Sequence, residues 1–383
     1  MRRAWVAGAG IHTTLGTDPA AAVDRLDRLE APETVPLRYG DTADEIPYRL
    51  LAGRPLERLE ERLYEVLDGV IERAIEAADL SASERAGLGV FLGSSSADVS
   101  VSEARFQREL ARDEHAIALR ASNSIANLAL HVRDRFGLAG PDYSFNTACT
   151  ASANALVSAS DMVGTGRLEA ALVVGAELFN VVTAAGFQGL GLLSASGMRP
   201  FDRDRDGLTP GEGCAALVLT ARRRDEHDLY LRGSATLCDT YSMSTTNPDG
   251  STVAKVIRQA LGRAGLAPGD IEALKVHGTA SLHSDEAEVA GMRAVFDPVP
   301  PLFALKPHIG HTLGACGLNE LLVFRAAAAR GLLPGTPGIA SPGRADLGLA
   351  LNQSLRPMER GHYMLNYFGF GGNNTSLIVS NVD

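Results

Sequence analysis

Apolar residues along the chain fall into two alternating patterns. Short apolar runs, several of them bounded by glycine, are typical of buried strands, whereas longer stretches carry apolar residues three and four positions apart, as an amphipathic helix does. Strands that alternate with helices in this way predict an α/β fold. The predicted strands are residues 5–10, 87–93, 143–148, 170–175, 215–219, 230–237, 273–277, 302–305, 363–367 and 376–380, and the predicted helices are residues 56–80, 123–136, 151–163, 253–264, 285–295 and 314–330.

A charged segment at residues 222–228 divides the chain into two unequal parts with a similar rhythm. In each part a predicted strand ends at a residue with reactive chemistry, and a helix rich in alanine, glycine and serine follows. This repetition predicts an internal duplication, with an N-terminal half at residues 1–228 and a C-terminal half at residues 229–383.

The composition is that of a globular protein with an acidic balance. Hydrophobic residues make up 45% and charged residues 21% of the 383 positions, which allows a large core and excludes disorder as the main state. The 36 basic and 46 acidic residues give a formal charge of −10, which argues against a general nucleic-acid-binding protein because such proteins need a dense basic face. No apolar stretch reaches the ~18–20 residues that span a bilayer. We therefore expect a cytoplasmic protein without membrane association.

Four cysteines are present, and only Cys149 lies where a strand is predicted to meet a helix. The positive end of a helix dipole and its free N–H groups favour the thiolate at such a position. The other three, Cys214, Cys238 and Cys316, lack this setting and are expected to be inert structural thiols. No CxxC pair occurs, so the sequence supports neither a zinc ribbon nor a thioredoxin-like motif.

Two histidines follow predicted strands at similar junctions. His277 ends the strand at 273–277, and His311 lies between a short strand and a small-residue helix. Together with Cys149 they are expected to converge on one cleft. Their spacing along the sequence fits no compact metal motif, whereas a cysteine nucleophile with two imidazoles suits acyl transfer.

Two carboxylates near the start of the helix at 285–295 are candidates for the same cleft. Asp285 and Glu288 stand three residues apart, although such charges also occur at helix N-termini simply because the dipole favours them. Lys306 lies on a short apolar approach, and a buried ammonium there needs a carboxylate partner. Glu288 is the candidate partner.

This set of motifs resembles the β-ketoacyl-[acyl-carrier-protein] synthases, the elongating condensing enzymes of type II fatty acid and polyketide synthesis. The resemblance implies a thiolase-like, five-layered αβαβα fold with two related halves. The motifs that carry it are TACT at 147–150, RPFDRDRDG at 199–207 with GEG at 211–213, HGT at 277–279, Lys306 with GHT at 310–312, and NYFGFGG at 366–372.

The resemblance also implies a role for each motif residue. Cys149 would be the nucleophile, and the N–H groups of Cys149 and Phe370 would form the oxyanion hole. His277 and His311 would assist decarboxylation.

Further residues of the site follow from the same resemblance. Lys306 would pair with Glu288 and balance the charge of the site, with Asp285 nearby. Ser96 stands where many relatives have a bulkier apolar residue in the acyl channel, which favours long or unusual acyl groups. The implied substrate-binding residues are Ser96, Phe187, Thr279, Ser281, Asp285, Phe368 and Phe370, of which Thr279 and Ser281 would bind the phosphopantetheine arm.

The implied reaction is a decarboxylating Claisen condensation. An acyl group carried on Cys149 would react with malonyl-acyl carrier protein and give 3-oxoacyl-acyl carrier protein, with no metal or redox cofactor. The implied partners are acyl carrier protein and either a second copy of the chain or a chain-length-factor-like, ketosynthase-related subunit. A thiolase acting on coenzyme A esters is the alternative with the same fold.

A possible docking surface for the carrier is a stripe of arginines in the helix at 56–80 and just before it. Arg54, Arg58 and Arg62 are spaced four residues apart and would share one face. The alternative is an ordinary solvated face with glutamate partners such as Glu57 and Glu61.

Overall fold

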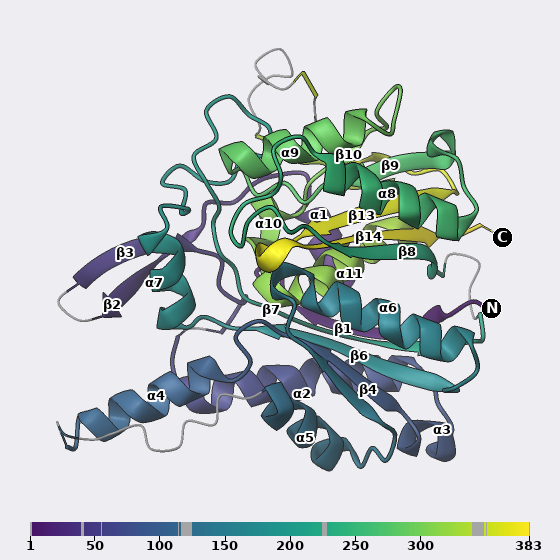
Figure 1. Cartoon of the computed structure of the whole chain (residues 1–383). Helices are drawn as coiled ribbons and strands as arrows, with labels where there is room; N and C mark the ends of the chain where they lie inside the picture. The colour runs from purple at the N-terminus through teal and green to yellow at the C-terminus, as the bar shows by residue number, and fades with distance from the viewer. Residues whose placement is uncertain are drawn as a thin grey trace.

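The computed structural model describes residues 2–39, 42–54, 56–113, 115, 125–223, 228–338, 348–349 and 351–382. In these ranges helices and strands alternate in five layers, from α2 and α5 at the bottom of Figure 1 to α8 and α9 at the top. The predicted α/β class and the five-layered αβαβα arrangement are confirmed.

Ten strands form one sheet in the order β10-β9-β13-β14-β8-β1-β7-β6-β4-β5. At its centre β1 and β8 are paired only through Trp5 and Tyr230, so the sheet consists of two sets of five strands. The first strand set is β1 (Trp5–His12), β4 (Gly89–Gly93), β5 (Asp142–Phe145), β6 (Ala170–Glu177) and β7 (Gly213–Thr220). The second strand set is β8 (Tyr230–Cys238), β9 (Ile271–Lys275), β10 (Leu302–Phe303), β13 (His362–Phe368) and β14 (Asn373–Ser380).

The two strand sets repeat the same pairing directions. In the first set β1–β7 and β6–β7 are antiparallel, while β4–β6 and β4–β5 are parallel. In the second set β8–β14 and β13–β14 are antiparallel, while β9–β13 and β9–β10 are parallel. An internal duplication produces this repetition. The boundary at residue 228 stays a prediction, and residues 224–227 of the charged segment lie outside the described residues.

Six long helices form the three helical layers. Helices α2 and α5 cover the outer face of the first strand set, α8 and α9 cover the second, and α6 and α11 lie between the two sets (Figure 1). Their bounds are α2 (Leu59–Ala77), α5 (Ile125–Phe136), α6 (Ala151–Gly164), α8 (Ser251–Ala264), α9 (Leu282–Arg293) and α11 (Cys316–Ala329).

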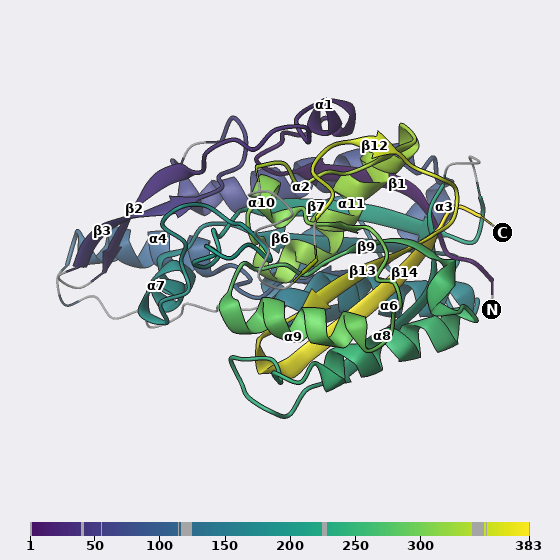
Figure 2. The ribbon, with the colours of Figure 1, turned by 90° about the horizontal axis from the view of Figure 1, so that it is seen from above.

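Several further elements, of which α4 is as long as α5 and α9, have no counterpart among the predicted ones. The hairpin β2–β3 projects with α4 and α7 at the end of the molecule opposite the two termini (Figure 2). The elements without a predicted counterpart are α1 (Pro19–Asp24), β2 (Glu33–Tyr39), β3 (Thr42–Tyr48), α3 (Ala82–Ala86), α4 (Val99–Leu110), η1 (Ala148–Thr150), α7 (Val181–Gly189), η2 (Pro268–Asp270), α10 (Lys306–Ile309), η3 (Leu313–Ala315), β11 (Leu332–Leu333), β12 (Arg356–Pro357) and η5 (Phe370–Gly372).

None of the helices in the described ranges is long and apolar enough to span a membrane.

The middle layer depends on glycine at the points where backbones touch. A Cβ at Gly317 in α11 would lie 2.2 Å from the backbone nitrogen of Ala153 in α6. A Cβ at Gly93, at the end of β4, would lie 2.3 Å from the backbone nitrogen of Ser152. The missing side chain of Gly317 therefore lets the N-terminal ends of α6 and α11 lie side by side, and that of Gly93 lets β4 approach α6.

We predict that Gly317→Ala destabilises the protein by about 1–3 kcal/mol, because the added methyl group overlaps main-chain atoms that have no free rotamer. Urea unfolding measures this change. The matched control is Gly262→Ala in α8, where nothing lies within 4 Å of the new Cβ. That control should be neutral or slightly stabilising. Equal stability of the two variants would contradict the close approach.

Candidate active site

A cavity of about 290 Å³ contains the predicted nucleophile and both predicted histidines in its lining. Cys149 reaches it from η1, His277 from the segment after β9, and His311 from the link between α10 and η3. Cys149 and His277 follow the carboxyl ends of β5 and β9. His311 follows α10, the short helix that comes after β10. The predicted convergence of these residues on one cleft is therefore what the structure shows.

Cys149 is held in a tight turn between β5 and α6. The preceding Ala148 has φ of 49°, the left-handed region that a residue with a Cβ rarely adopts. The Thr150 hydroxyl donates to the Thr147 carbonyl oxygen at 2.8 Å, and the Asn154 amide donates to the Thr147 hydroxyl at 2.8 Å. These bonds hold the turn, and Cys149 is left 8% exposed in the cavity wall.

The environment of the Cys149 thiol combines burial with several positive groups. Burial raises its pKa to about 11, while Lys306 and hydrogen bonds from the backbone N–H groups of Phe370 and Cys149 act in the opposite direction. The predicted effect of the backbone N–H groups is present, but burial outweighs it and the free thiol is neutral. The two N–H groups that reach the thiol are those expected to form the oxyanion hole.

The two imidazoles lie edge to face, with ring centroids 5.6 Å apart. Burial, followed by the charge of Lys306, holds the pKa of both His277 and His311 well below the ordinary value. Both rings are therefore neutral. The Lys306 ammonium lies 3.4 Å from His277 Nδ1, and an ammonium can only donate. His277 Nδ1 therefore accepts, and the ring proton is on Nε2.

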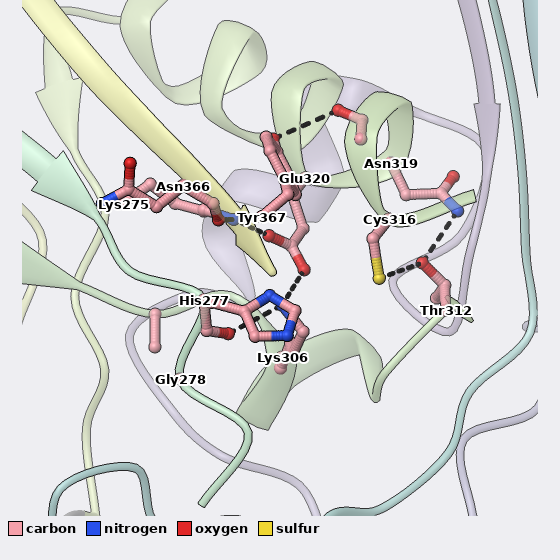
Figure 3. A network of polar contacts seen from close by, with 12 residues as sticks. Lys275, His277, Gly278, Lys306, Thr312, Cys316, Asn319, Glu320, Asn366 and Tyr367 are labelled. Atoms are coloured by element: carbon pink, nitrogen blue, oxygen red, sulfur yellow. Dashed lines mark hydrogen bonds and ion pairs between the residues drawn. The ribbon is translucent and has the colours of Figure 1, made fainter. Parts of the chain in front are cut away.

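Lys306 pairs with Glu320, not with Glu288 as predicted. Its Nζ lies 2.8 Å from Glu320 Oε1 and donates to the His277 carbonyl oxygen at 2.7 Å (Figure 3). The Glu288 carboxylate is occupied elsewhere, because it accepts the backbone N–H groups of His277 at 2.7 Å and Gly278 at 2.9 Å. Glu288 therefore holds the turn that carries His277.

A second buried ammonium, which the sequence did not indicate, shares the same carboxylate. Lys275 is ion-paired with Glu320 Oε2, donates to the Asn366 carbonyl oxygen at 2.7 Å, and lies 3.6 Å from the centre of the Tyr367 ring (Figure 3). Burial alone would raise the pKa of Glu320, but Lys275 and Lys306 together lower it. Glu320 is therefore ionised, and α11 supplies the counter-ion of both lysines.

Asp285 is buried beside the RPFDRDRDG loop and is not among the described residues of the cavity wall. Its carboxylate accepts the Phe201 N–H at 2.8 Å and lies 3.7 Å from the Arg205 guanidinium. Burial raises its pKa to about 7. The structure therefore places it as a support for that loop, away from the predicted contact with substrate.

Five of the predicted substrate residues line the cavity: Phe187, Thr279, Ser281, Phe368 and Phe370. Phe187 and Phe370 lie with ring centroids 6.1 Å apart, and Phe368 lies 5.7 Å from the His277 ring. The hydroxyl groups of Thr279 and Ser281 are 3.2 Å apart in the same wall. The cavity wall thus combines aromatic rings with hydroxyl groups.

A loop at residues 239–246, which sequence analysis did not assign to the site, completes the wall. Asp239, Met243 and residues 244–246 line the cavity, and Met243 is 84% exposed. The Gly371 N–H donates to the Met243 carbonyl oxygen at 2.7 Å. A Cβ at Gly372, which has φ of 74°, would lie 1.8 Å from the Asp239 carbonyl oxygen. The only sequence signal for this contact is the glycine-rich turn itself.

Ser96 is likewise absent from the described lining of this cavity. Its hydroxyl bonds the buried carboxylate of Glu177, which also accepts the Ser94 hydroxyl at 3.1 Å and the Ser95 hydroxyl at 2.7 Å. Ser96 therefore serves to hold Glu177, and its small size does not enlarge this cavity. Its place in an acyl channel stays a prediction.

The arginine stripe is not a free surface. Arg62 is buried and ion-paired with Glu212, while Arg54 and Arg58 pair with glutamates of α2 at 2.9 Å and 3.0 Å. Arg62 therefore does not share an exposed face with the other two arginines, and docking of the carrier on Arg54 and Arg58 stays a prediction. A separate search for a metal site is also negative: the described residues include no cluster of three or more histidine, cysteine or acidic side chains that could hold a metal ion.

Comparison with known proteins agrees with this geometry. The models of the β-ketoacyl synthase N-terminal and C-terminal domains match residues 61–225 and 230–340. The chloroplastic 3-oxoacyl-[acyl-carrier-protein] synthase I of Hordeum vulgare is 28% identical over 99% of this chain and 89% of its own. A β-ketoacyl synthase from Burkholderia phymatum STM815 matches over the full length of both chains with 26% identity and a TM-score of 0.84.

A third similar protein is a ketosynthase from Xenorhabdus doucetiae, solved in complex with its chain length factor. It covers 99% of this chain and 98% of its own with 24% identity and a TM-score of 0.81. The two family models together match well over half of the chain, in sequence order, and the cavity holds the cysteine and the two histidines of their motifs. The chain thus belongs to the β-ketoacyl synthase family and is a condensing acyltransferase.

Proposed function

We propose that the chain condenses an acyl group held on Cys149 with malonyl-acyl carrier protein, releasing carbon dioxide and 3-oxoacyl-acyl carrier protein. One observation carries this proposal: the buried Cys149 thiol shares a cavity with the imidazoles of His277 and His311, whose ring centroids are 5.6 Å apart. Fatty acid synthesis and polyketide synthesis both use this reaction, and the proposal covers either pathway.

In the first half-reaction the Cys149 sulfur attacks the thioester carbonyl of the acyl carrier. The thiol proton passes to the departing carrier sulfur as the new carbon–sulfur bond to Cys149 forms and the carrier's carbon–sulfur bond breaks. The N–H groups of Cys149 and Phe370 stabilise the tetrahedral oxyanion. Loss of one such donor costs about 3–4 kcal/mol in comparable sites.

In the second half-reaction malonyl carrier loses carbon dioxide and leaves an enolate. Its negative charge develops on the thioester oxygen, so it needs hydrogen-bond donors rather than a strong base. Burial lowers the pKa of His277 and His311, so each ring is neutral and carries one N–H. These two N–H groups can donate to the enolate oxygen. The carbanion attacks the acyl–Cys149 carbonyl, and Cys149 leaves as the thiolate, which takes up a proton from solvent to restore the thiol. This scheme balances without electron transfer, so the reaction needs no redox cofactor.

The carrier is the proposed partner at the cavity mouth. Hydroxyl groups of Thr279, Ser281 and residues 244–246 can bond the amides of a phosphopantetheine arm. The exposed side chains of Met243 and Leu282 give the rim an apolar edge. A cytoplasmic location stays a prediction, because the barley relative is described as chloroplastic.

The proposed subunit interface lies along β5. This strand ends the sheet order, and three of its four residues are exposed, among them Tyr143, which stacks on Phe91. An open strand edge of this kind pairs readily with another chain. The partner is either a second copy or a ketosynthase-like subunit, as in the Xenorhabdus doucetiae complex.

The thiolase alternative requires a second cysteine that acts as a base on the substrate. Cys316 is the nearest candidate, but it is fully buried and not part of the described cavity wall. Burial also raises its pKa, so the thiol stays protonated at neutral pH and is not available as a base. The geometry therefore favours the decarboxylating reaction.

We predict that intact-protein mass spectrometry will detect one added acyl group after incubation with acyl carrier proteins. Subsequent malonyl carrier protein should discharge the group and release a 3-oxoacyl product. The Cys149→Ala variant should remain unacylated. Native mass spectrometry of the same sample reports whether the 40.3 kDa chain forms a homodimer.

Acylation by coenzyme A thioesters with no discharge by malonyl carrier protein would overturn this proposal in favour of a thiolase. A chain that stays unacylated alone but reacts after a ketosynthase-like subunit is added would identify the heterodimer.

We also predict that Glu320→Gln will lower the free energy of unfolding by about 3–5 kcal/mol, because both ammonium groups lose their counter-ion in a buried site. Decarboxylation of malonyl carrier should fall with it, since Lys306 would no longer be held against His277. The control is Glu169→Gln, an exposed residue at the start of β6. Urea unfolding at pH 7 compares the two, and equal midpoints would refute the charge-balancing role.

A further inference from the structure

A second cavity, of about 840 Å³, lies at the far end of α6 from Cys149. The carboxyl ends of α6 and α8 and the first residues of β8 border it, on the side where Figure 1 marks the N-terminus. Helix α6 has 14 residues and is therefore about 20 Å long. The two cavities share none of their described lining residues. The second cavity is thus separate from the condensation site, and its volume is typical of a small-ligand pocket.

Four arginines from four separate segments line this second cavity. Arg2 precedes β1, Arg167 follows α6, Arg232 lies in β8 and Arg263 lies in the last turn of α8. A fifth, Arg3, lies over a tyrosine ring. Within the part of the chain that the structure describes, the first four form no ion pair with a carboxylate. Residues far apart in the sequence therefore bring positive charge to one place.

The charges around the second cavity do not balance among the described residues. Asp161 is the one acidic residue in the described lining, and it lies near Arg263. The carboxyl ends of α6 and α8 add about half a negative charge each. Four guanidinium groups therefore exceed these negative groups by about two charges. Like charges that are gathered in this way repel one another, and an anion in the cavity would remove the repulsion.

Hydrogen bonds to the main chain and to one hydroxyl hold two of the arginines in place. Arg232 Nε donates to the Ala264 carbonyl oxygen at 3.2 Å, and its Nη1 donates to the Tyr230 hydroxyl at 3.0 Å. Arg263 Nη1 donates to the Ser234 carbonyl oxygen at 3.1 Å. In both side chains Nη2 donates to none of the described residues. Each guanidinium is thus anchored and keeps N–H groups for a further acceptor.

Two buried hydroxyl groups in the same lining point to a ligand independently of the arginines. Ser160, in the last turn of α6, is 8% exposed, and Ser234, in β8, is 7% exposed. Neither hydroxyl forms a hydrogen bond with the described residues. The hydroxyl of Thr165, by contrast, donates to the Asp161 carbonyl oxygen at 2.7 Å. A buried hydroxyl without a partner is costly, so both serines are suited to donate to a group that enters the cavity.

We propose that the second cavity binds a small anion with two phosphate groups, held by the four arginines and the two serine hydroxyls. Phosphate oxygens accept hydrogen bonds, and the guanidinium fork binds them in pairs. Two or three negative charges on a diphosphate match the excess of about two positive charges. A cavity favours a small ligand, because nucleic acid needs a broad basic face. This proposal does not depend on the condensation reaction.

Isothermal titration of the wild-type protein with inorganic pyrophosphate tests the site. One pyrophosphate should bind per chain. Arg167→Gln and Arg263→Gln should each weaken binding about tenfold, because each removes charge-assisted hydrogen bonds, and Ser160→Ala should weaken it about fivefold. The matched control is Arg135→Gln in α5, where the arginine pairs with Asp68 at 3.3 Å and Glu72 at 3.2 Å. That variant should keep the wild-type affinity. Absence of binding, or equal affinity in all of these proteins, would overturn the site.

The same titration with inorganic phosphate and with adenosine diphosphate identifies the source of the phosphate groups. Equal affinity for pyrophosphate and adenosine diphosphate would indicate a free anion. Tighter binding of adenosine diphosphate would indicate an organic diphosphate that also contacts the cavity through its nucleoside. Phosphate that binds as tightly as pyrophosphate would refute the assignment of two phosphate groups.

Thermal unfolding gives a readout that needs neither activity nor a calorimetric signal. Pyrophosphate should raise the unfolding midpoint of the wild type, because a ligand that binds only the folded state stabilises it. The double variant Arg167→Gln/Arg263→Gln should show little of this rise, although removal of two repelling charges should leave its midpoint without anion equal or higher. Sodium chloride at the same ionic strength controls for general screening. A rise of the same size with sodium chloride, or in the double variant, would contradict specific binding.

Discussion

The contact between α6 and α11 is the constraint on which the site depends. These helices belong to opposite strand sets, and each begins beside a reactive residue, Cys149 for α6 and His311 for α11. Their backbones touch because Gly317 faces Ala153. If they were held apart by the width of ordinary side chains, the nucleophile and the imidazole would not share one cavity. Packing at the centre of the molecule thereby sets the geometry of the chemistry.

Charge balance in the dry interior follows from the same arrangement. Glu320 projects from α11 and meets Lys275 from β9 and Lys306 from α10. A carboxylate or an ammonium alone would be very costly at this depth, so the three groups are stable only together. Burial, together with the charges of Lys306 and Lys275, keeps the two histidines neutral, which is the state that donates to an enolate.

Sequence patterns predicted those parts of the structure that depend on local order. The apolar runs located the strands of both sets, and short motifs located Cys149, His277, His311 and Lys306 at their ends. The hairpin β2–β3 was missed because each of its strands contains a proline, Pro36 in β2 and Pro47 in β3, and a proline argues against a strand assignment.

Pairings between distant residues could not be predicted in the same way. Glu288 was a plausible partner for Lys306 by chemistry, but the turn of His277 uses its carboxylate. Glu320 lies in the middle of a buried helix, where a single acidic residue gives no periodic signal. Ser96 and Asp285 carry small polar groups whose partners, Glu177 and the Phe201 N–H, lie more than eighty residues away.

The position of the nucleophile has a consequence for how such a chain can evolve. The Cys149 thiol takes no part in the Lys275–Glu320–Lys306 ion pairs, in the Glu288 turn or in the contact between α6 and α11. The scaffold therefore does not depend on it. After gene duplication, a single codon change at position 149 would silence one copy and leave its architecture and its β5 edge intact. A catalytic protein of this build thus lies one mutation away from a purely structural companion.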